Sequence, residues 1–363
     1  MKNIPKYVVV KTKQELELHD NKKLKTNTEY IIPAGWLGMM VMPNQVTLVS
    51  EDVGYLWKPY NISRDLNGKS LLIQRASGFG DMLFTSPIIK YIRLKYPKIK
   101  ELSFATNAKY KSILKAIPGI DTIHTMPLEV EILKQYDYHI SFMSLIEGGQ
   151  EDDRNIYKKW FSAIGVTNPS HDFCLPIIKD DIPVIKTEYP KTIGIQPFGG
   201  LRLKDLHPRF LANLIPELIT RKYHIILFAE KTEPRLGPLT QILKDKVSYS
   251  FDYLQKDKTI YGSLQIAKGC DCMLSCDSVF AHAGPALGVD TISVYGPFCA
   301  NAYTKHYRHS WSIDTGPVCR CRSHSTPECM KYGYPSPCMD IDIKYILDII
   351  DSQLNKSNHL IIK

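Results

Sequence analysis

The chain has 363 residues, and 44% of them are hydrophobic, which is enough to bury the cores of two to three globular domains. Its 46 Lys and Arg against 37 Asp and Glu leave a net charge of +9, spread along the sequence, which favours anionic partners. No window approaches the roughly 18 consecutive apolar residues of a membrane span, and residues 1–20 are charged throughout, which excludes a membrane-spanning protein and predicts a cytoplasmic one.

The N-terminal part, residues 1–67, has the pattern of a small β-rich module. Short runs of β-forming residues at 7–10, 30–35, 37–42 and 46–50 are separated by Gly, Pro and Asn turns. This spacing predicts a barrel or a sandwich.

From Lys69 the pattern changes to alternating strands and helices, which is typical of a parallel sheet covered by helices. Strands are expected at 71–74, 102–106 and 137–142, with helices at 81–96 and 108–116. After a Pro-containing linker near 180–191, strands are expected at 192–196, 224–229, 272–276 and 291–296, with a helix at 208–221. We therefore expect two α/β domains, 68–185 and 186–310, then a Cys-rich insert at 311–340 and a C-terminal helix and tail at 341–363.

Three strand-to-helix turns carry chemically useful residues, and ligands of such folds bind beyond the carboxyl ends of the strands. The first turn, RASGFGD at 75–81, has Leu83 at the third glycine position of the dinucleotide fingerprint, so that fingerprint fails. Gly80 is expected to turn the chain sharply and to place Asp81 at the start of a long helix. There Asp81 is either a functional carboxylate or a helix cap that contributes about 1 kcal/mol.

The second turn, QPFGGLRLKDLHP at 196–208, places Gly199 and Gly200 directly after a strand and then adds the cations Arg202 and Lys204. Backbone N–H groups at glycines, together with cations, form phosphate sites. The alternative is a solvated basic loop.

The third turn is LSCDSVFAHAGPALGVDTISVYGP at 274–297. Asp277 and Ser278 lie between a strand and a helix N-terminus, where the helix dipole favours a phosphate, and His282 follows one turn later. The alternative is that Asp277 and Ser278 cap the helix and that His282 is a hydrogen-bonded core residue.

Four motifs in this order resemble glycosyltransferase family 9, the ADP-heptose heptosyltransferases of lipopolysaccharide synthesis: RASGFGDMLFTSP, PGIDTIH, IGIQPFGGLRLKDL and CDSVFAHAGPALGVDTISVYGP. The likeness covers roughly residues 69–343. It implies the GT-B fold, in which two Rossmann-like domains face each other, here with the β-rich module and the Cys-rich insert added. It also implies inverting transfer of a sugar, heptose or another, from a nucleotide-diphosphate sugar to an acceptor hydroxyl.

The resemblance assigns the first turn to the acceptor side. Asp81 matches the general base that takes the proton of the acceptor hydroxyl, and Ser77, Gly78 and Gly80 complete that turn. A helix start weakens a carboxylate as a base, so the hydroxyl must be held in line with the anomeric carbon.

The other two turns are assigned to the donor. Lys204 matches the lysine that contacts the diphosphate and stabilises the leaving group without a metal, and Asp277 matches the residue that contacts donor hydroxyls. Ser278 matches the residue whose N–H meets the phosphate, and His282 matches the histidine that closes the motif. Gly199, Gly200 and Arg202 complete the expected donor set, although some members have hydroxyl residues in place of the glycines. Residues 1–67 have no counterpart in the simple heptosyltransferases, so the sugar and the acceptor stay open.

The Cys-rich insert contains Cys319, Cys321, Cys329 and Cys338 within twenty residues. Four thiolates at this spacing can hold a structural zinc or iron. The resemblance points the same way, because autotransporter heptosyltransferases have an iron-binding cysteine finger at this place. The alternative is a set of reduced thiols.

Three functions follow from the sequence. The leading one is a glycosyltransferase whose acceptor is a glycan or lipid core, a protein, or a modified nucleobase in DNA, as in phage-type DNA glycosylation. A basic chain with a β-rich module suits a polymeric anionic acceptor. The alternative is a non-catalytic nucleotide- or glycan-binding subunit that forms a homo-oligomer through the β-rich module. A weaker alternative is a UDP-sugar 2-epimerase, which shares the two-domain architecture.

Overall fold

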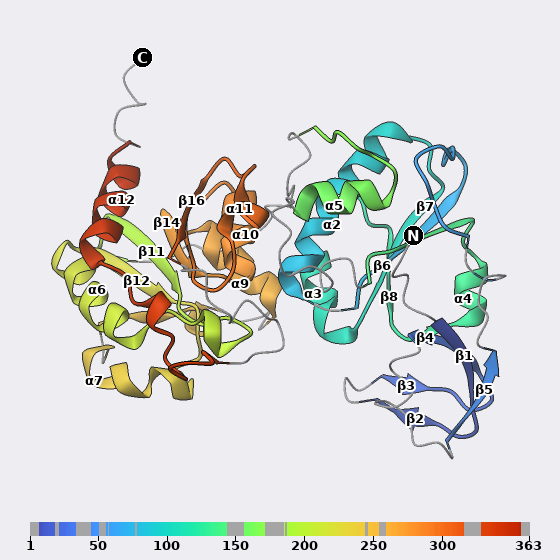
Figure 1. The fold of residues 1–363 in the computed structure, drawn as a ribbon, viewed down its shortest axis with the longest axis horizontal. Coiled ribbons are helices and arrows are strands. Elements are labelled where there is room, and N and C mark those ends of the chain that lie inside the picture. The colour runs from blue at the N-terminus through green and yellow to red at the C-terminus, as the bar shows by residue number, and fades with distance from the viewer. Residues whose placement is uncertain are drawn as a thin grey trace. The chain divides into compact units, whose positions relative to one another are not determined.

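A computed structural model of the chain describes residues 7–18, 22–33, 45–50, 56, 58–76, 78–143, 156–170, 185, 187–243, 246–253, 259–315 and 328–356. The chain divides into two compact units (Figure 1). The first comprises Met1–Gly149 and Ile156–Pro176, and the second comprises Gln150–Asn155 and Ile177–Lys363. The strand expected at 37–42 lies outside the described residues.

The first unit contains a parallel sheet at the expected place. Its four strands, in the order β10-β6-β7-β8, are β6 (Ser70–Gln74), β7 (Glu101–Thr106), β8 (Thr122–Thr125) and β10 (Tyr138–Ser141). All neighbouring strands are parallel. The apolar run of β6 is buried at every position, as befits a central parallel strand. The chain builds outward from β6 to β8 and then returns to the other side with β10, so the sheet is doubly wound with its switch point between β6 and β10.

Helices connect these strands. They are α2 (Phe79–Lys95), η2 (Ala108–Tyr110), α3 (Lys111–Leu114), α4 (Val130–Lys134) and α5 (Ile156–Ala163). The residues of α2 from Met82 to Ile89 are all buried, so this helix is part of the core of the unit. It begins two residues before the expected start at Asp81.

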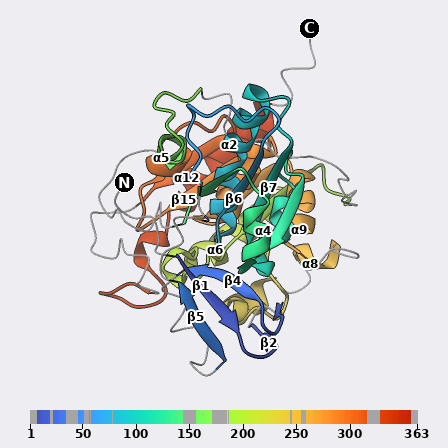
Figure 2. The ribbon, with the colours of Figure 1, turned by 90° about the vertical axis from the view of Figure 1, so that its right-hand side faces the viewer.

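The N-terminal strands form a second, antiparallel sheet. Its order is β5-β1-β4-β9, with β1 (Tyr7–Thr12), β4 (Glu29–Pro33), β5 (Val46–Ser50) and β9 (Leu128–Glu129); β2 (Leu16–Glu17) and β3 (Lys23–Leu24) form a separate ribbon. The sequence did not predict β9, which comes from the α/β part of the unit and pairs with β4 through Ile31 and Leu128. Figure 2 shows α4, which follows β9, beside β4. The N-terminal strands are thus tied to the α/β part by backbone pairing.

The second unit is built on a six-stranded parallel sheet in the order β13-β12-β11-β14-β15-β16. The strands are β11 (Lys191–Gln196), β12 (Tyr223–Leu227), β13 (Ser248–Tyr249), β14 (Cys272–Cys276), β15 (Asp290–Tyr295) and β16 (Ser310–Asp314). Every pair is parallel. In chain order the strands run 3-2-1-4-5-6, the dinucleotide-fold arrangement, with the switch point between β11 and β14. The predicted α/β class with parallel sheets is confirmed.

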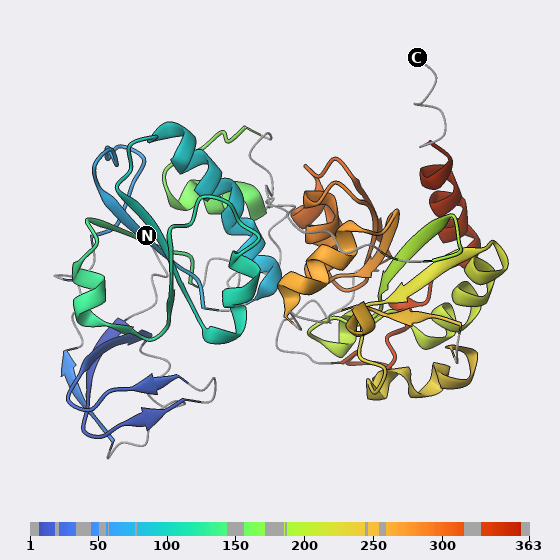
Figure 3. The ribbon, with the colours of Figure 1, turned by 180° about the vertical axis from the view of Figure 1, so that it is seen from behind.

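Helices lie on both faces of this sheet. They are η4 (Arg202–Lys204), α6 (Pro208–Thr220), η5 (Pro234–Leu239), α7 (Thr240–Leu243), α8 (Ser250–Tyr253), α9 (Ile260–Lys268), α10 (Val279–Ala286), α11 (Ala300–Thr304), η6 (Pro337–Met339) and α12 (Ile343–Lys356). Buried residues of α6 and α12 share one core with the central strands. Figure 3 shows the red α12 and the orange α10 on opposite sides of the strands. In the described ranges, no helix combines the length and the apolarity that a membrane crossing needs.

Candidate functional site

The switch point of the second unit brings the second and third turns together. Strands β11 and β14 are paired up to Gln196 and Ser275, so both turns leave from the same edge of the sheet. A Cβ atom on Gly199 would lie 3.0 Å from Cβ of Lys204 and 3.4 Å from the carbonyl oxygen of Asp277. The second turn therefore packs directly on the third, and glycine is the residue that fits there.

Lys204 and Asp277 form the centre of this site. Nζ of Lys204 lies 2.9 Å from Oδ2 of Asp277, and the two side chains are 15% and 5% exposed. The contact is an ion pair, and within the described part of the chain Oδ2 has no hydrogen-bond partner. The same ammonium group lies 4.4 Å from the ring centroid of Phe298. A half-buried ammonium group can bind a phosphate, and a buried carboxylate whose oxygen can still accept a hydrogen bond can bind a sugar hydroxyl.

Ser278 and His282 both lie close to this pair. Ser278 is at the N-cap position of α10, but its side chain makes no cap bond, and its hydroxyl lies 3.1 Å from that of Ser275. His282 is buried, with Nδ1 3.1 Å from the Tyr307 hydroxyl. Burial lowers the pKa of His282 to about 4, against the opposing effect of Asp277, so the ring is neutral at pH 7. It can exchange hydrogen bonds but adds no charge to the site.

Sequence reasoning missed two aromatic residues of this site. Tyr295 ends β15 and is fully buried, its hydroxyl has no hydrogen-bond partner in the described part of the chain, and burial raises its pKa well above the usual value. Its ring is parallel to that of Tyr303, with centroids 6.1 Å apart. Phe298 follows three residues later. Both residues belong to the sequence VYGPF at the end of β15. A tyrosine at the end of an apolar strand places a hydroxyl group among buried residues, and this could have indicated a site.

Arg202 points to a different part of the unit. Its Nη1 lies 3.1 Å from Oε1 of Glu328, and its guanidinium lies 5.5 Å from the ring centroid of Tyr334. Arg202 is therefore engaged with the Cys-rich segment. Gly200 has open space around its Cα position, since an added Cβ would meet no atom within 4 Å.

The first turn, in the first unit, differs from expectation in two ways. The residue with positive φ is Gly78, at 84°, whereas Gly80 lies inside α2, so the predicted sharp turn at Gly80 is wrong. Gly78 is also the N-cap of α2, without a side-chain bond, so the capping interpretation of Asp81 is wrong as well. Asp81 is the third residue of the helix. Ser77 lies outside the described residues.

Asp81 instead pairs with Arg75, which sequence reasoning overlooked. Nη2 of Arg75 donates to Oδ2 of Asp81, and Nη1 donates to the carbonyl oxygen of Phe142 at 2.9 Å, just beyond β10. The Arg75 side chain is 3% exposed and lies 6.0 Å from the ring centroid of Trp160, whereas Asp81 is 26% exposed. The guanidinium thus bridges the switch point and orients a carboxylate that solvent can reach. An Arg directly after a strand with an apolar centre indicates a buried cation that needs a partner.

The predicted metal ligands are only partly described. Cys329 and Cys338 are half-buried, and Cys319 and Cys321 lie outside the described residues. No three His, Cys, Asp or Glu side chains converge as a metal site in the ranges that the structure describes.

Solved structures of glycosyltransferases match the chain at low identity. The family 9 glycosyl transferase of Veillonella parvula is 13% identical, with a TM-score of 0.60, and the match covers 81% of this chain and 99% of that one. The ADP-heptose lipopolysaccharide heptosyltransferase II of E. coli is 14% identical, with a TM-score of 0.57, covering 80% and 99%. No protein-family model and no curated protein sequence matches the chain. The fold is that of family 9 glycosyltransferases. The resemblance of the four motifs is confirmed at the level of the fold.

A third glycosyltransferase structure matches a longer part of the chain. TibC of enterotoxigenic E. coli, an iron-containing dodecameric glycosyltransferase, is 10% identical, with a TM-score of 0.56, and the match covers 97% of this chain and 91% of TibC. The unmatched 3% of 363 residues is about 11 residues, against about 73 for heptosyltransferase II. The match to TibC therefore includes most of residues 1–67. TibC has also been solved in complex with an ADP-linked heptose.

Proposed function

We propose that the chain is an inverting glycosyltransferase that moves a sugar from a nucleotide-diphosphate sugar to an acceptor hydroxyl. The observation that carries this proposal is the Lys204–Asp277 pair at the switch point of the second unit. An ammonium group beside a helix start suits a diphosphate, and the buried carboxylate suits sugar hydroxyls. The fold supports the same reaction class. An ADP-linked heptose, which TibC binds, is the first donor to test.

The donor set acts on the leaving group. Lys204 stabilises the negative charge that develops on the diphosphate as the bond to the anomeric carbon breaks, so the proposed chemistry needs no metal there. Asp277 orients the sugar through its hydroxyls, and His282 is a neutral hydrogen-bonding neighbour. Gly200 and the start of α10 at Ser278 supply backbone N–H groups for the phosphates.

Asp81 acts on the acceptor. It takes the proton of the acceptor hydroxyl while the oxygen attacks the anomeric carbon and the diphosphate departs with the bonding electrons, which inverts the configuration. The Arg75 guanidinium weakens Asp81 as a base because it stabilises the charged carboxylate. The acceptor hydroxyl therefore loses its proton only as its oxygen forms the bond to the anomeric carbon, which requires that the acceptor and the donor sugar be held in line.

We propose that the acceptor is a glycan or lipid core, a protein, or a modified nucleobase in DNA. A basic chain suits an anionic acceptor, and binding to duplex DNA that falls steeply with salt supports the nucleic acid. Mass spectrometry of candidate acceptors with the donor that binds identifies the class. A homo-oligomer and a cytoplasmic location stay predictions from the sequence.

One observation favours a non-catalytic binding subunit as a second candidate. Asp81, the only base proposed, is fixed by a buried guanidinium, which suits a structural ion pair as well as a weak base. Asp81→Asn separates the two candidates.

The experiment measures release of nucleoside diphosphate from ADP-, GDP- and UDP-sugars, with and without acceptors. In D81N we expect the rate of transfer to fall by about 10²-fold or more, the usual contribution of a general base, with donor binding retained in the other unit. Asp65→Asn, an exposed carboxylate of the same unit, is the matched control. Transfer by D81N at the wild-type rate contradicts the base assignment, and a wild type that consumes no donor supports the binding subunit.

We also propose a structural zinc or iron held by Cys319, Cys321, Cys329 and Cys338. Cys329 and Cys338 are half-buried thiols of one segment, and thiolates are the ligands that these metals prefer. TibC, which the chain resembles over most of its length, contains iron. Four protein ligands leave no open position, so the role of the metal is structural.

A further inference from the structure

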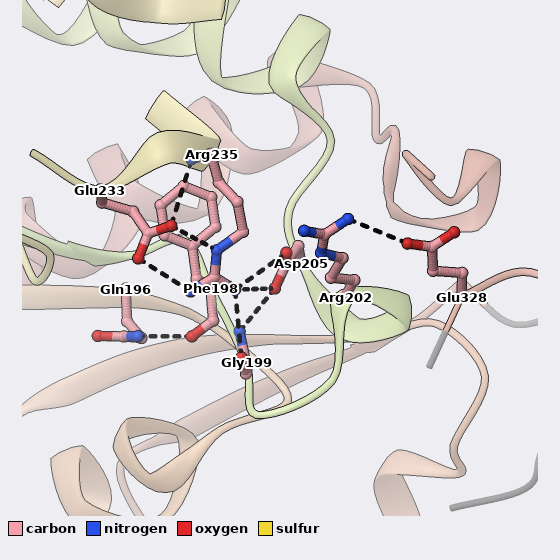
Figure 4. A network of polar contacts seen from close by, with 8 residues as sticks. All are labelled: Gln196, Phe198, Gly199, Arg202, Asp205, Glu233, Arg235 and Glu328. Carbon is pink, nitrogen blue, oxygen red and sulfur yellow. Dashed lines mark hydrogen bonds and ion pairs between the residues drawn. The ribbon is translucent and has the colours of Figure 1, made fainter. Parts of the chain in front are cut away.

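The second glycine turn, residues 197–201, is held by a buried carboxylate (Figure 4). Asp205 is 1% exposed, and its Oδ1 accepts the N–H of Gly199 at 2.8 Å. The N–H of Leu206 donates to the carbonyl oxygen of Pro197, also at 2.8 Å, which ties the start of the turn to the residue that follows Asp205. The N–H of Gly199 is therefore used inside the turn, and the shape of the turn depends on Asp205.

Arg235 holds this turn from outside. It lies on η5, after β12, and its Nη1 is 3.2 Å from each carboxylate oxygen of Asp205 and 3.4 Å from the carbonyl oxygen of Gly199. Its guanidinium also lies 4.3 Å from the ring centroid of Phe198. The Arg235 side chain thus contacts Phe198 and Gly199 within the turn and Asp205 after it.

Glu233 fixes the other edge of the guanidinium. Nε and Nη2 of Arg235 donate to the two oxygens of Glu233 at 2.8 and 3.1 Å, and Glu233 also accepts the backbone N–H of Arg235. A planar guanidinium with donors on two edges can bridge two carboxylates at once, whereas a lysine ammonium cannot keep this geometry. Figure 4 shows Arg235 between Glu233 and Asp205.

The charges explain why the bridge matters. Burial raises the pKa of Asp205 to about 6, and it outweighs the opposing effects of the Gly199 N–H and of Arg235. The hydrogen bonds of Glu233, with Asp205 adding to them, raise the pKa of Arg235 and keep it charged. Without Arg235, Asp205 would be a buried carboxylate without a cation, so it would take up a proton or leave its place.

We propose that Arg235 is a positioning residue for the donor diphosphate, because it fixes the glycine turn against Lys204 and Asp277. The inference rests on the proposed function, which assigns the diphosphate to this turn. Gly199 provides the mechanical link, since there is no room for even a Cβ atom between it, Lys204 and the Asp277 carbonyl without a shift. A displaced turn therefore moves Lys204 away from the phosphates.

The test compares full-length wild type, R235Q and R235K for binding of ADP, GDP and UDP by calorimetry, and of the parent nucleosides by NMR titration. In R235Q we expect the affinity for the bound diphosphate to fall about tenfold or more, because the displaced turn weakens the charge-assisted contact of Lys204 with the phosphates. The affinity for the nucleoside, which has no phosphate, stays unchanged. R235K keeps the positive charge but cannot bridge Asp205 and Glu233, so we expect its diphosphate affinity to lie between those of the wild type and R235Q.

Arg221→Gln is the control, because it removes one positive charge and an ion pair with Asp351 elsewhere in the same unit. If R235Q shows no cooperative thermal unfolding, and is therefore not folded, the comparison is made between the wild type and R235K. A wild type that binds none of the three diphosphates overturns the proposed function and this inference with it. Wild-type binding that both variants keep at full strength overturns the inference alone, and so does an equal loss of diphosphate and nucleoside affinity.

Discussion

At the scale of single residues, the position of Asp81 depends on the absence of a side chain at Gly78. Gly78 has φ of 84°, and an added Cβ would overlap the Asp81 carboxylate. Asp81 cannot move aside without breaking its ion pair with the buried Arg75. The glycine is therefore needed for both the backbone conformation and the carboxylate position.

We expect Gly78→Ala to abolish transfer and to lower the free energy of unfolding by about 1–3 kcal/mol, the cost of a strained left-handed residue. Donor binding, assigned to the other unit, is retained. Gly68→Ala is the matched control, because Gly68 also has positive φ, 71°, but open space around it. Thermal unfolding and transfer assays compare the two, and a G78A variant as active as G68A contradicts the role of this contact.

At the scale of elements, the sequence predicted the buried strands well and the exposed ones poorly. β6, β11 and β14 have apolar residues at their centres and are buried almost throughout, which is typical of central parallel strands. β8 has the sequence TIHT at the edge of its sheet, and a half-exposed edge strand has no apolar run to reveal it. The start of α2 was misplaced because an Asp resembles a cap, whereas Gly78 is the N-cap and the helix begins at Phe79.

The residues of the candidate site were predicted where a motif isolates them. Lys204 follows a glycine turn and Asp277 comes directly after β14, so local patterns identify them. Arg75 lies in the same motif as its partner Asp81, six positions away, so its pairing could have been read from the local sequence. Arg235 acts on the glycine turn through Asp205, which is 30 positions away, and such a long-range pair leaves no local pattern.

The Cys-rich segment carries a prediction at the same scale. Its described part contacts the second turn and the start of α6: Glu328 pairs with Arg202, Asp340 pairs with Arg209, and the Met339 carbonyl accepts the N–H of His207 at 3.1 Å. We expect about one zinc or iron per chain, because one four-thiolate site binds one metal. Removing it loosens these contacts and weakens diphosphate binding, and adding it back restores binding. Elemental analysis and calorimetry measure both, and protein purified without chelators that contains no metal contradicts the prediction.

At the scale of the whole molecule, the N-terminal strands belong to the core of the first unit. Ile31 and Val9 pack in one buried cluster with Leu72 of the parallel sheet. The Tyr7 hydroxyl donates to Oε1 of Gln74 at 3.2 Å, at the end of β6 that leads into the first turn. A pattern of short strands predicts a module, but it does not show which surface the module buries. The proposed acceptor turn is thus supported by residues about 70 positions earlier in the chain.

Ile31→Ala tests this support. Ile31 is 1% exposed and pairs with Leu128 of β9, so its truncation should lower the free energy of unfolding by about 2–5 kcal/mol. Because the core is shared, we expect faster hydrogen exchange in β6 as well as in β1 and β4. Leu48→Ala, at a 44% exposed position of β5 in the same antiparallel sheet, should change neither. Exchange that rises only in the N-terminal strands, with β6 as protected as in the wild type, would mean that residues 1–67 fold apart from the rest of the unit.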